Sequence, residues 1–214
     1  MAICDANYNF LYCDVGVQGR IADGGVFAST DFCSALQNNK LNLPNARSLP
    51  GRQINVPFVI VADDAFALSG NVMKPFPGKH FKGSVERAYN YRHSRARRVI
   101  ENAFGILSAV FRVLRKPMLL APDKVTQVVL SCVYLHNFLR RNRKSRDIYS
   151  PPSAFDREDD NGNLIQGEWR RDNIELGSLR NCSTNNRNLD GITIRNEFAQ
   201  YFHNQPLSWQ HRCA

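Results

Sequence analysis

The sequence of 214 residues lacks a long apolar run, a secretory signal and any paired arrangement of cysteines. No stretch approaches the roughly 20 apolar residues that a membrane-spanning helix needs. The residues after Met1 show neither the basic start nor the apolar core of a signal peptide. The six cysteines have no CxxC pair and no zinc-ligand spacing, so we expect reduced thiols. These absences argue against a membrane protein, a disulfide scaffold and a zinc domain, whereas 43% hydrophobic residues suffice for a folded core.

Acidic residues are scarce in the middle of the chain. Residues 85–146 contain 14 Lys and Arg against 3 Asp and Glu, a net charge of +11, whereas the rest of the chain sums to −2. Most of these basic residues are arginines, whose planar guanidinium suits phosphate. The concentration predicts binding to a polyanion, most often a nucleic acid. A basic surface that only keeps the protein soluble is the alternative.

A continuous apolar run, Phe58–Ala62, follows Pro57 and predicts a central strand covered on both faces. The run ends abruptly in Asp63 and Asp64. Carboxylates at the end of a buried strand lie at the rim of the sheet, where α/β folds place their sites. A turn or a helix cap formed by these two acids is an equally good interpretation of the pattern.

A helix is expected from Val99 to Leu114, because apolar residues recur there at steps of three and four. Glu101 is the single acid in this stretch. Its neighbours on the helical cylinder are small or basic: Ser94, Arg97, Gly105, Ser108 and Arg112. Small side chains beside a lone acid leave space for a ligand, and the arginines suit an anion such as phosphate. A solvated helix face with local Arg–Glu pairs is the alternative.

Further elements are expected around these two segments. The patterns predict a hairpin over Ala2–Val15, a short helix capped by Ser29 or Thr30, a helix that starts near Pro122 and a short helix over Ile192–Phe202. Residues 41–56 and 71–83 are rich in Pro, Gly and Asn and predict loops.

Two features of the second half of the chain bear on function. His136 lies on the apolar face of the helix after Pro122, which favours a hydrogen-bonded core histidine over a metal ligand. The run RRNRKSR over residues 140–146 would suit a basic helix end, a phosphate contact or a nuclear import signal. From Asp147 the chain becomes acidic and linker-like, and we expect no packed element before Ile192.

Four segments resemble a known family in their order and spacing: FLYCDVGVQGRIADGGVF, VPFVIVADDAFAL, RHSRARRVIENAFGILSAVFRVL and VYLHNFLRR. Together they are similar to the nuclease domain of PIF/Harbinger transposases and their domesticated relatives, within the DDE superfamily. The resemblance covers residues 1–145 and, more weakly, YFHNQPLSWQ near the end. It implies an α/β fold of the RNase H-like kind, with a mixed sheet flanked by helices. It also implies cleavage of DNA with a divalent metal cation, Mg²⁺ or Mn²⁺.

The resemblance assigns roles to particular residues. Asp63, in VIVADDAF, matches the second aspartate of the family and Glu101, in RRVIENAFG, matches its glutamate, so both would be catalytic and would bind metal. Apart from the resemblance, the positive charge of the central segment assigns four of its residues to DNA binding: Arg95, Arg97, Arg98 and Arg112. The first aspartate of the family sits on a strand before the hairpin, and neither Asp5 nor Asp14 occupies its place. We therefore expect the first catalytic strand to be missing, which makes the domain N-terminally incomplete.

The sequence thus predicts a partial DDE-type nuclease domain over residues 1–146 and an acidic linker with a C-terminal helix or tail over residues 147–214. Two-metal cleavage needs cations about 3.5–4 Å apart that are held by carboxylate oxygens, so the loss of one aspartate should impair activity. A domesticated fragment that binds DNA or a protein without cutting is the alternative. The resemblance implies DNA as the substrate, a separate Myb-like DNA-binding partner and a nuclear location, with neither a membrane nor a small-molecule cofactor.

Overall fold

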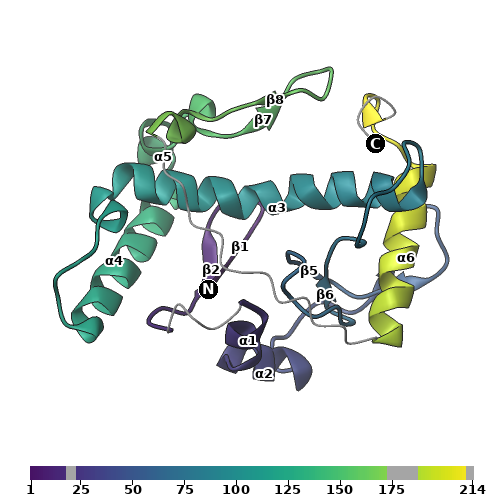
Figure 1. The fold of residues 1–214 in the computed structure, drawn as a ribbon, viewed down its shortest axis with the longest axis horizontal. Helices are drawn as coiled ribbons and strands as arrows, with labels where there is room; N and C mark the ends of the chain where they lie inside the picture. The colour runs from purple at the N-terminus through teal and green to yellow at the C-terminus, as the bar shows by residue number, and fades with distance from the viewer. Residues whose placement is uncertain (18–22, 173–187, 211–214) are drawn as a thin grey trace. The chain divides into compact units, whose positions relative to one another are not determined.

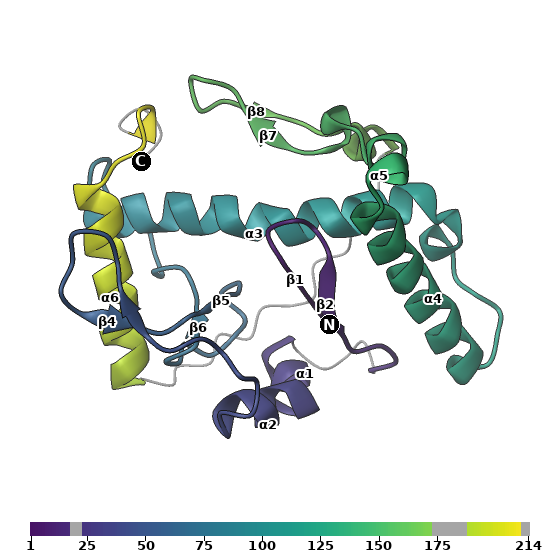
Figure 2. The same ribbon diagram turned by 180° about the vertical axis from the view of Figure 1, so that it is seen from behind.

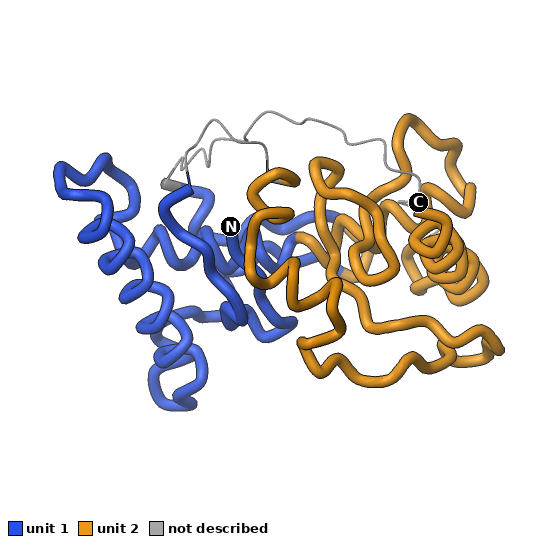
Figure 3. Tube along the Cα trace, turned by 90° about the horizontal axis from the view of Figure 1, so that it is seen from below, with its two compact units in different colours: residues 1–20, 98–159, 163–178 blue, residues 21–97, 160–162, 179–214 orange. Residues whose placement is uncertain are grey.

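The computed structural model describes residues 1–17, 23–172 and 188–210. The chain divides into two compact units, which are coloured blue and orange in Figure 3. Unit 1 contains residues 1–20, 98–159 and 163–178, and unit 2 contains residues 21–97, 160–162 and 179–214. Each unit is assembled from segments that are far apart in the sequence.

Six α-helices lie within the described residues (Figure 1): α1 Asp23–Ala28, α2 Asp31–Gln37, α3 Val85–Val110, α4 Pro122–Arg141, α5 Arg143–Tyr149 and α6 Leu189–Asn204. Three short 3-10 helices accompany them: η1 Arg112–Arg115, η2 Pro152–Ala154 and η3 Glu168–Asp172. Three strand pairs are antiparallel: β1 Ala2–Cys4 with β2 Phe10–Cys13, β3 Arg47–Ser48 with β4 Asn55–Val56, and β7 Arg157–Glu158 with β8 Leu164–Ile165. One pair is parallel: β5 Ile60–Val61 with β6 Val72–Met73. The described chain is therefore a mixed α/β fold with short two-stranded sheets.

Unit 1 is built on the C-terminal half of α3. Its buried apolar cluster joins β2, α3 and α4 through Phe10, Ala103, Leu107, Cys132 and Val133. The predicted apolar stripe of α3 packs here, except for Val110, which is exposed. The hairpins β1–β2 and β7–β8 lie on opposite sides of α3 in both Figure 1 and Figure 2. This half of the helix consequently contacts protein on two sides.

The open edge of β2 is covered by a side chain of α4. The Asn137 side-chain oxygen accepts a hydrogen bond from the Phe10 N–H at 2.8 Å, and its Nδ2 donates to the Phe10 carbonyl at 2.8 Å. An amide offers the donor and the acceptor that a neighbouring strand would offer. Asn137 therefore satisfies a strand edge that would otherwise leave a half-buried backbone unpaired.

Unit 2 is organised around the parallel pair β5–β6. Val72 and Met73 of β6 are buried, and Ala62 directly after β5 is buried with them. The N-terminal half of α3 covers this pair, and His93 Nε2 lies 3.1 Å from the Met73 carbonyl oxygen. The strand expected over Phe58–Ala62 forms only over Ile60–Val61, and Val61 is 38% exposed, so the expectation of cover on both faces is wrong for Val61.

Helix α6 is fixed within unit 2 by rings and by an ion pair. The Phe202 ring stacks on Tyr89 of α3 with centroids 6.1 Å apart. Glu197, which is 5% exposed, accepts two hydrogen bonds from Arg52 at 2.6 and 2.7 Å. These contacts lower the pKa of Glu197, chiefly through the Arg52 hydrogen bonds. The helix expected over Ile192–Phe202 is thus confirmed, with an earlier start at Leu189.

Helix α3 begins at Val85 and not at Val99 as the apolar stripe predicts. A start signal is present in the sequence, because the Ser84 hydroxyl accepts from the Arg87 N–H at 3.2 Å. Arg95, Arg97 and Arg98 therefore lie inside the helix, whereas the sequence pattern places them before its start or at it. The stretch 71–83, expected to be loop, contains strand β6.

The segment after Asp147 is packed, and the expectation of no packed element before Ile192 is wrong. The 3-10 helices η2 and η3 and the hairpin β7–β8 lie there, and α5 ends there. Asp156 and Trp169 are only 5% and 6% exposed. Their burial depends on contacts with α3 that acidic and linker-like composition does not reveal. The domain boundary at residue 146 stays a prediction.

Several other expectations are confirmed. The hairpin forms over β1–β2, Thr30 caps α2 through its hydroxyl, and α4 begins at Pro122. The sequence pattern misses α1, because Asp23-Gly24-Gly25 reads as a turn. An α/β fold is confirmed, and the RNase H-like arrangement stays a prediction. Within the described residues, no helix is both long and apolar enough to cross a membrane.

His136 of α4 is a core histidine, as its position on the apolar face predicts. It is 0% exposed, and its Nε2 lies 2.8 Å from the Tyr8 carbonyl oxygen. A carbonyl can only accept, so Nε2 carries the proton and Nδ1 accepts from the Tyr149 hydroxyl at 2.7 Å. Burial lowers the pKa of His136 from 6.5 to about 4, because the neutral ring is favoured away from water.

This burial predicts a pH dependence of stability. A base whose pKa is lowered by folding binds fewer protons in the folded state, so its contribution is complete above pH 6.5 and falls as the pH drops toward 4. His136→Gln keeps an amide donor and acceptor but cannot titrate in this range. The free energy of unfolding, measured with urea at several pH values between 4 and 7, should fall more steeply with decreasing pH in wild type than in the variant. The two slopes should differ by up to about 1 kcal/mol per pH unit. Parallel curves for the two proteins would contradict the assignment.

Candidate functional site

Asp63 lies two residues after the end of β5, where the sequence places a site carboxylate. Its Oδ1 accepts a hydrogen bond from the Ala65 N–H at 3.0 Å, so this side chain also forms the turn that ends the strand. A Cβ on Gly24 of α1 would lie 2.5 Å from the Ala65 carbonyl oxygen, and this close approach fixes the turn against α1. Asp63 therefore forms the turn, which is one of the two interpretations of the Asp63-Asp64 pair, and it also stands where the other interpretation predicts a site carboxylate.

The surroundings of Asp63 contain a buried histidine of α3. Burial lowers the pKa of His93, and the carboxylate of Asp63 acts in the opposite direction. Asp63 is thus within electrostatic reach of His93. Asp64 is exposed, and its backbone carbonyl accepts from Lys74 Nζ at 2.9 Å. The two adjacent acids consequently occupy different environments, and Asp63 is the half-buried one.

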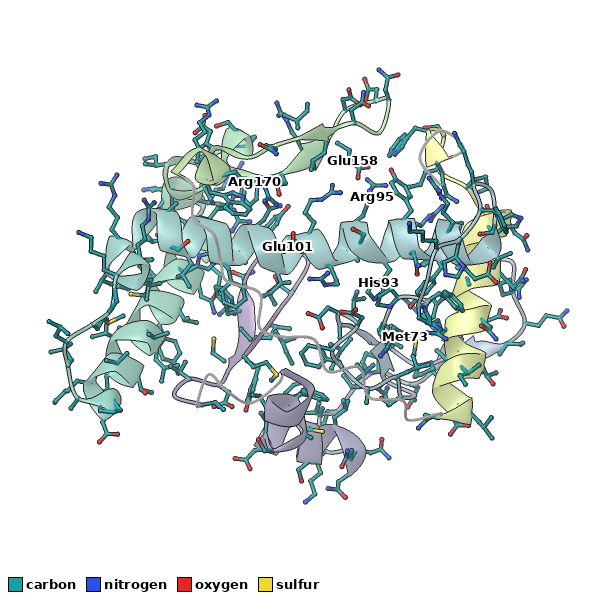
Figure 4. The ribbon with its side chains drawn as sticks, viewed as in Figure 1. Met73, His93, Arg95, Glu101, Glu158 and Arg170 are labelled. Carbon is teal, nitrogen blue, oxygen red and sulfur yellow. The ribbon has the colours of Figure 1, made fainter. Side chains whose placement is uncertain are left out.

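Glu101 lies on α3 in unit 1, where an arginine from the chain's C-terminal third approaches it. Arg170 Nη2 is 3.8 Å from Glu101 Oε2, and the two side chains are 33% and 41% exposed (Figure 4). The same Nη2 donates to Asp156 Oδ2 at 2.6 Å. Glu101 therefore belongs to a charged cluster that sequence analysis did not find.

Asp156 anchors this cluster. Its side chain is 0% exposed, and its carboxylate accepts from Arg170 Nε at 2.8 and 2.9 Å and from the Gly167 N–H at 2.8 Å. Loss of one partner of a fully buried pair costs about 3–5 kcal/mol, and less where a third of one side chain is exposed. The Asp156 hydrogen bond raises the already high pKa of Arg170, so the guanidinium stays charged.

Asn102, the residue after Glu101, joins α3 to the same segment. Its Oδ1 accepts from the Asp156 N–H and from Trp169 Nε1, both at 2.9 Å. Its Nδ2 donates to the Asp156 carbonyl at 3.3 Å. Asn102 is 1% exposed, so these bonds satisfy an amide that would be costly to bury unpaired. The network holds η3 against the part of α3 that carries Glu101.

The space that the sequence predicts beside Glu101 is partly filled by the protein itself. A Cβ on Gly105 would lie 2.2–2.6 Å from atoms of the Trp169 indole, so the ring packs directly on the glycine backbone. Ser108 is buried and donates to the Gly105 carbonyl at 3.1 Å. The small residues of this face therefore accommodate Trp169, and the expectation that they leave open space is wrong at Gly105.

The four arginines assigned to DNA binding have different surroundings. Arg95 lies over the rings of Tyr91 and Trp209, at 5.8 and 5.3 Å from their centroids. Arg98 Nη1 donates to Glu158 Oε1 at 3.0 Å. Arg97 is half-buried in α3, and Arg112 in η1 is exposed. Arg112 is the one of the four that is exposed, whereas the other three are half-buried.

Asp63 belongs to unit 2 and Glu101 to unit 1, so a metal site that the two residues share stays a prediction. Across residues 1–17, 23–172 and 188–210, no group of three or more His, Cys, Asp or Glu side chains is placed to hold a metal ion. Carboxylate oxygens are nevertheless the donors that Mg²⁺ and Mn²⁺ prefer, so the chemistry of these two residues fits such an ion.

The sequence pattern does not indicate Asp156, Trp169 or Arg170 as site residues. They stand in a segment whose acidic composition suggests a linker, and a single Trp and a single Asp carry no periodic signal. One signal was available, because Gly105 interrupts a helix where alanine would be favoured. A glycine inside a helix indicates close packing by another group, which here is the Trp169 indole.

Comparison with known families agrees with the resemblance at the level of the superfamily. The family model described as a DDE superfamily endonuclease matches residues 1–137, and the chain therefore belongs to that family. The matched region contains both Asp63 and Glu101. No curated protein and no solved structure matches the chain.

The packing of Trp169 on Gly105 predicts that Gly105→Ala lowers the stability of the protein, although a change from glycine to alanine inside a helix usually raises it. Gly→Ala in a helix usually gains up to about 1 kcal/mol. Gly105→Ala should instead destabilise by on the order of 1–3 kcal/mol, because the new methyl overlaps the indole. Urea unfolding followed by Trp169 fluorescence, in a Trp209→Phe background, measures the effect. Ser94→Ala, at an exposed position of α3, is the control and should change stability by less than about 0.5 kcal/mol. A stabilised Gly105→Ala protein would show that the indole does not pack there.

Proposed function

We propose that this protein is a nuclease of the PIF/Harbinger transposase-derived type that hydrolyses phosphodiester bonds of DNA. The match to DDE superfamily endonucleases over residues 1–137 carries the proposal. Two observations support it: Asp63 follows strand β5 of the parallel pair, and Glu101 stands on the long helix α3. These are the positions that the resemblance assigns to the second aspartate and the glutamate.

Asp63 and Glu101 would hold the divalent cation, Mg²⁺ or Mn²⁺. When bound, such an ion polarises the phosphate and activates a water molecule. The protein's own residues set the geometry: Asp63 is fixed by the turn with Ala65, and Glu101 is fixed on a rigid helix. A half-buried carboxylate and a partly exposed one suit this role, because both keep access to an ion that arrives from solvent.

Two carboxylates are fewer than the family uses, and we propose that cleavage by these 214 residues is weak. The resemblance places a further carboxylate donor, the first aspartate of the family, on a strand before the β1–β2 hairpin. We further propose that the protein has an RNase H-like fold with a mixed sheet. Both pairing types that such a sheet needs are present.

The second candidate function is binding without cleavage, either of DNA or of a protein. The excess of +11 charge over residues 85–146 favours it, because that segment would attract DNA whether or not a metal site is complete. In either case we propose a nuclear protein, with a Myb-like partner that supplies sequence recognition. The basic run over residues 140–146 supports nuclear import.

The nuclease proposal predicts a restored activity. The 214-residue chain should nick supercoiled plasmid weakly with Mg²⁺ or Mn²⁺, and adding the family's preceding strand with its aspartate should restore cleavage. Asp63→Asn or Glu101→Gln should then reduce the rate by on the order of 10³-fold or more, since each exchange removes a charged ligand at constant size. Asp64→Asn is the control and should retain activity, because Asp64 is exposed beside the site.

Strong cleavage by the 214-residue chain would contradict the proposed impairment and would point to another acid, with Asp14 the first to test. Full activity of both Asp63→Asn and Glu101→Gln would overturn the assigned site.

DNA binding predicts a measurable change in salt dependence. Each arginine that neutralises a phosphate contributes about one unit to the slope of log K against log salt concentration. Arg112→Gln should lower that slope by about 1, because the exposed Arg112 side chain can reach a phosphate. Lys40→Gln, outside the basic segment and exposed, is the matched control. Fluorescence anisotropy with a labelled duplex measures both slopes, and equal slopes for the two variants would exclude Arg112 from the interface.

A further inference from the structure

Arg170 joins a fixed anion to the carboxylate of Glu101. Its guanidinium meets Asp156 through Nε and Nη2, with the shortest contact at 2.6 Å, and Nη2 also lies 3.8 Å from Glu101 Oε2. The Trp169 ring supports the guanidinium from one face, with 4.3 Å between the Arg170 Cζ and the ring centroid. Figure 4 shows Arg170 beside Glu101 on α3.

The position of Arg170 is determined by buried groups and not by Glu101. Asp156 has no exposed side-chain surface, and Trp169 is held both by Asn102 and by its packing on Gly105. A guanidinium that forms a fork with a buried carboxylate has few alternative orientations. The Glu101 side chain is 41% exposed, compared with 33% for Arg170. Its rotamer is therefore less restricted by packing, and a fixed neighbour such as Arg170 can favour one rotamer over the others.

We propose that Arg170 is a positioning residue that orients the Glu101 carboxylate for a divalent cation. The inference rests on the proposed function, which makes Glu101 a metal ligand. Carboxylates that bind metal are held in place by partners outside the metal's own ligands, and loss of such a partner typically costs about 10–100-fold in metal affinity. For Glu101 this partner is the ion pair with Arg170 at 3.8 Å. Sequence comparison over residues 1–137 does not reach Arg170, so this assignment comes from the structure alone.

Charge balance favours positioning over competition with the cation. An arginine without a counter-ion would repel a divalent ion bound to Glu101. Asp156 already neutralises Arg170, so the pair presents no net charge to the ion. The contact with Glu101 is also long, at 3.8 Å, which allows the carboxylate to approach a cation without breaking a short hydrogen bond.

Mn²⁺ binding to the full 214-residue chain tests the proposal without measuring activity. Paramagnetic broadening of the amide signals of residues 99–103, followed through a titration, gives the affinity at Glu101. Arg170→Gln should weaken it by about 10–100-fold. Arg171→Gln is the matched control, since Arg171 is the adjacent arginine, its side chain is 78% exposed and it pairs with Glu168. It should bind as wild type does.

Two more variants separate positioning from folding. Asp156→Asn combined with Arg170→Gln removes both buried charges, and Arg170→Lys keeps the charge but replaces the fork by one ammonium. The Trp169 indole N–H signal in the same spectra reports whether the Asn102 contact persists. In each variant that keeps this signal, Mn²⁺ affinity should fall as it does in Arg170→Gln.

Glu101→Gln distinguishes failure of the inference from failure of the proposed function. If it leaves the broadening unchanged, the cation does not bind at Glu101 and the proposed function fails with it. If Glu101→Gln abolishes the broadening while the Arg170 variants bind as tightly as wild type, only the positioning role is overturned. Tighter binding by the Arg170 variants would likewise overturn it and would show that Arg170 competes with the cation.

Discussion

Burial of the Asp156 carboxylate is the constraint on which the surroundings of Glu101 depend. A buried carboxylate needs a cation and hydrogen-bond donors, and Arg170 and the Gly167 N–H supply them. Asn102 of α3 accepts a hydrogen bond from the Asp156 backbone N–H, and the Trp169 indole N–H donates to the same side-chain oxygen. Both contacts hold this segment against the helix. A segment with the composition of a linker is thereby fixed against the helix that carries the proposed metal-binding glutamate.

Helix α3 is packed against other segments in both units. In unit 1 its C-terminal half buries an apolar stripe against β2 and α4 and a second, polar contact against η3. In unit 2 its N-terminal half places His93 over β6 and Tyr89 against Phe202. A helix with two buried faces cannot present all of its arginines to a ligand. Arg98 is paired with Glu158, whereas Arg112, beyond the end of the helix, is exposed.

Arg170 takes part both in a buried ion pair that stabilises the fold and in the contact with Glu101, the proposed metal ligand. Asp156 and Arg170 form a pair that is costly to break, and the same guanidinium contacts the carboxylate proposed to hold a cation. A site supported in this way gains precision from the packed segment behind it. It also becomes sensitive to changes in residues that no metal or substrate would touch, such as Gly105 and Trp169.

The sequence by itself determined the local features: the β1–β2 hairpin, the start of α2 at Thr30 and of α4 at Pro122, and the apolar stripe of α3. These could be predicted because turn chemistry, helix caps and periodicity act over a few residues. The sequence also determined the family. It could also indicate Asp63 and Glu101, since both stand in recognisable segments. Only the tertiary structure decided that Gly105 receives an indole, that Asp156 is buried and that Arg170 reaches Glu101. The contacts with α3 join residues more than 50 positions apart, and burial created by such distant partners leaves no periodic trace in the chain.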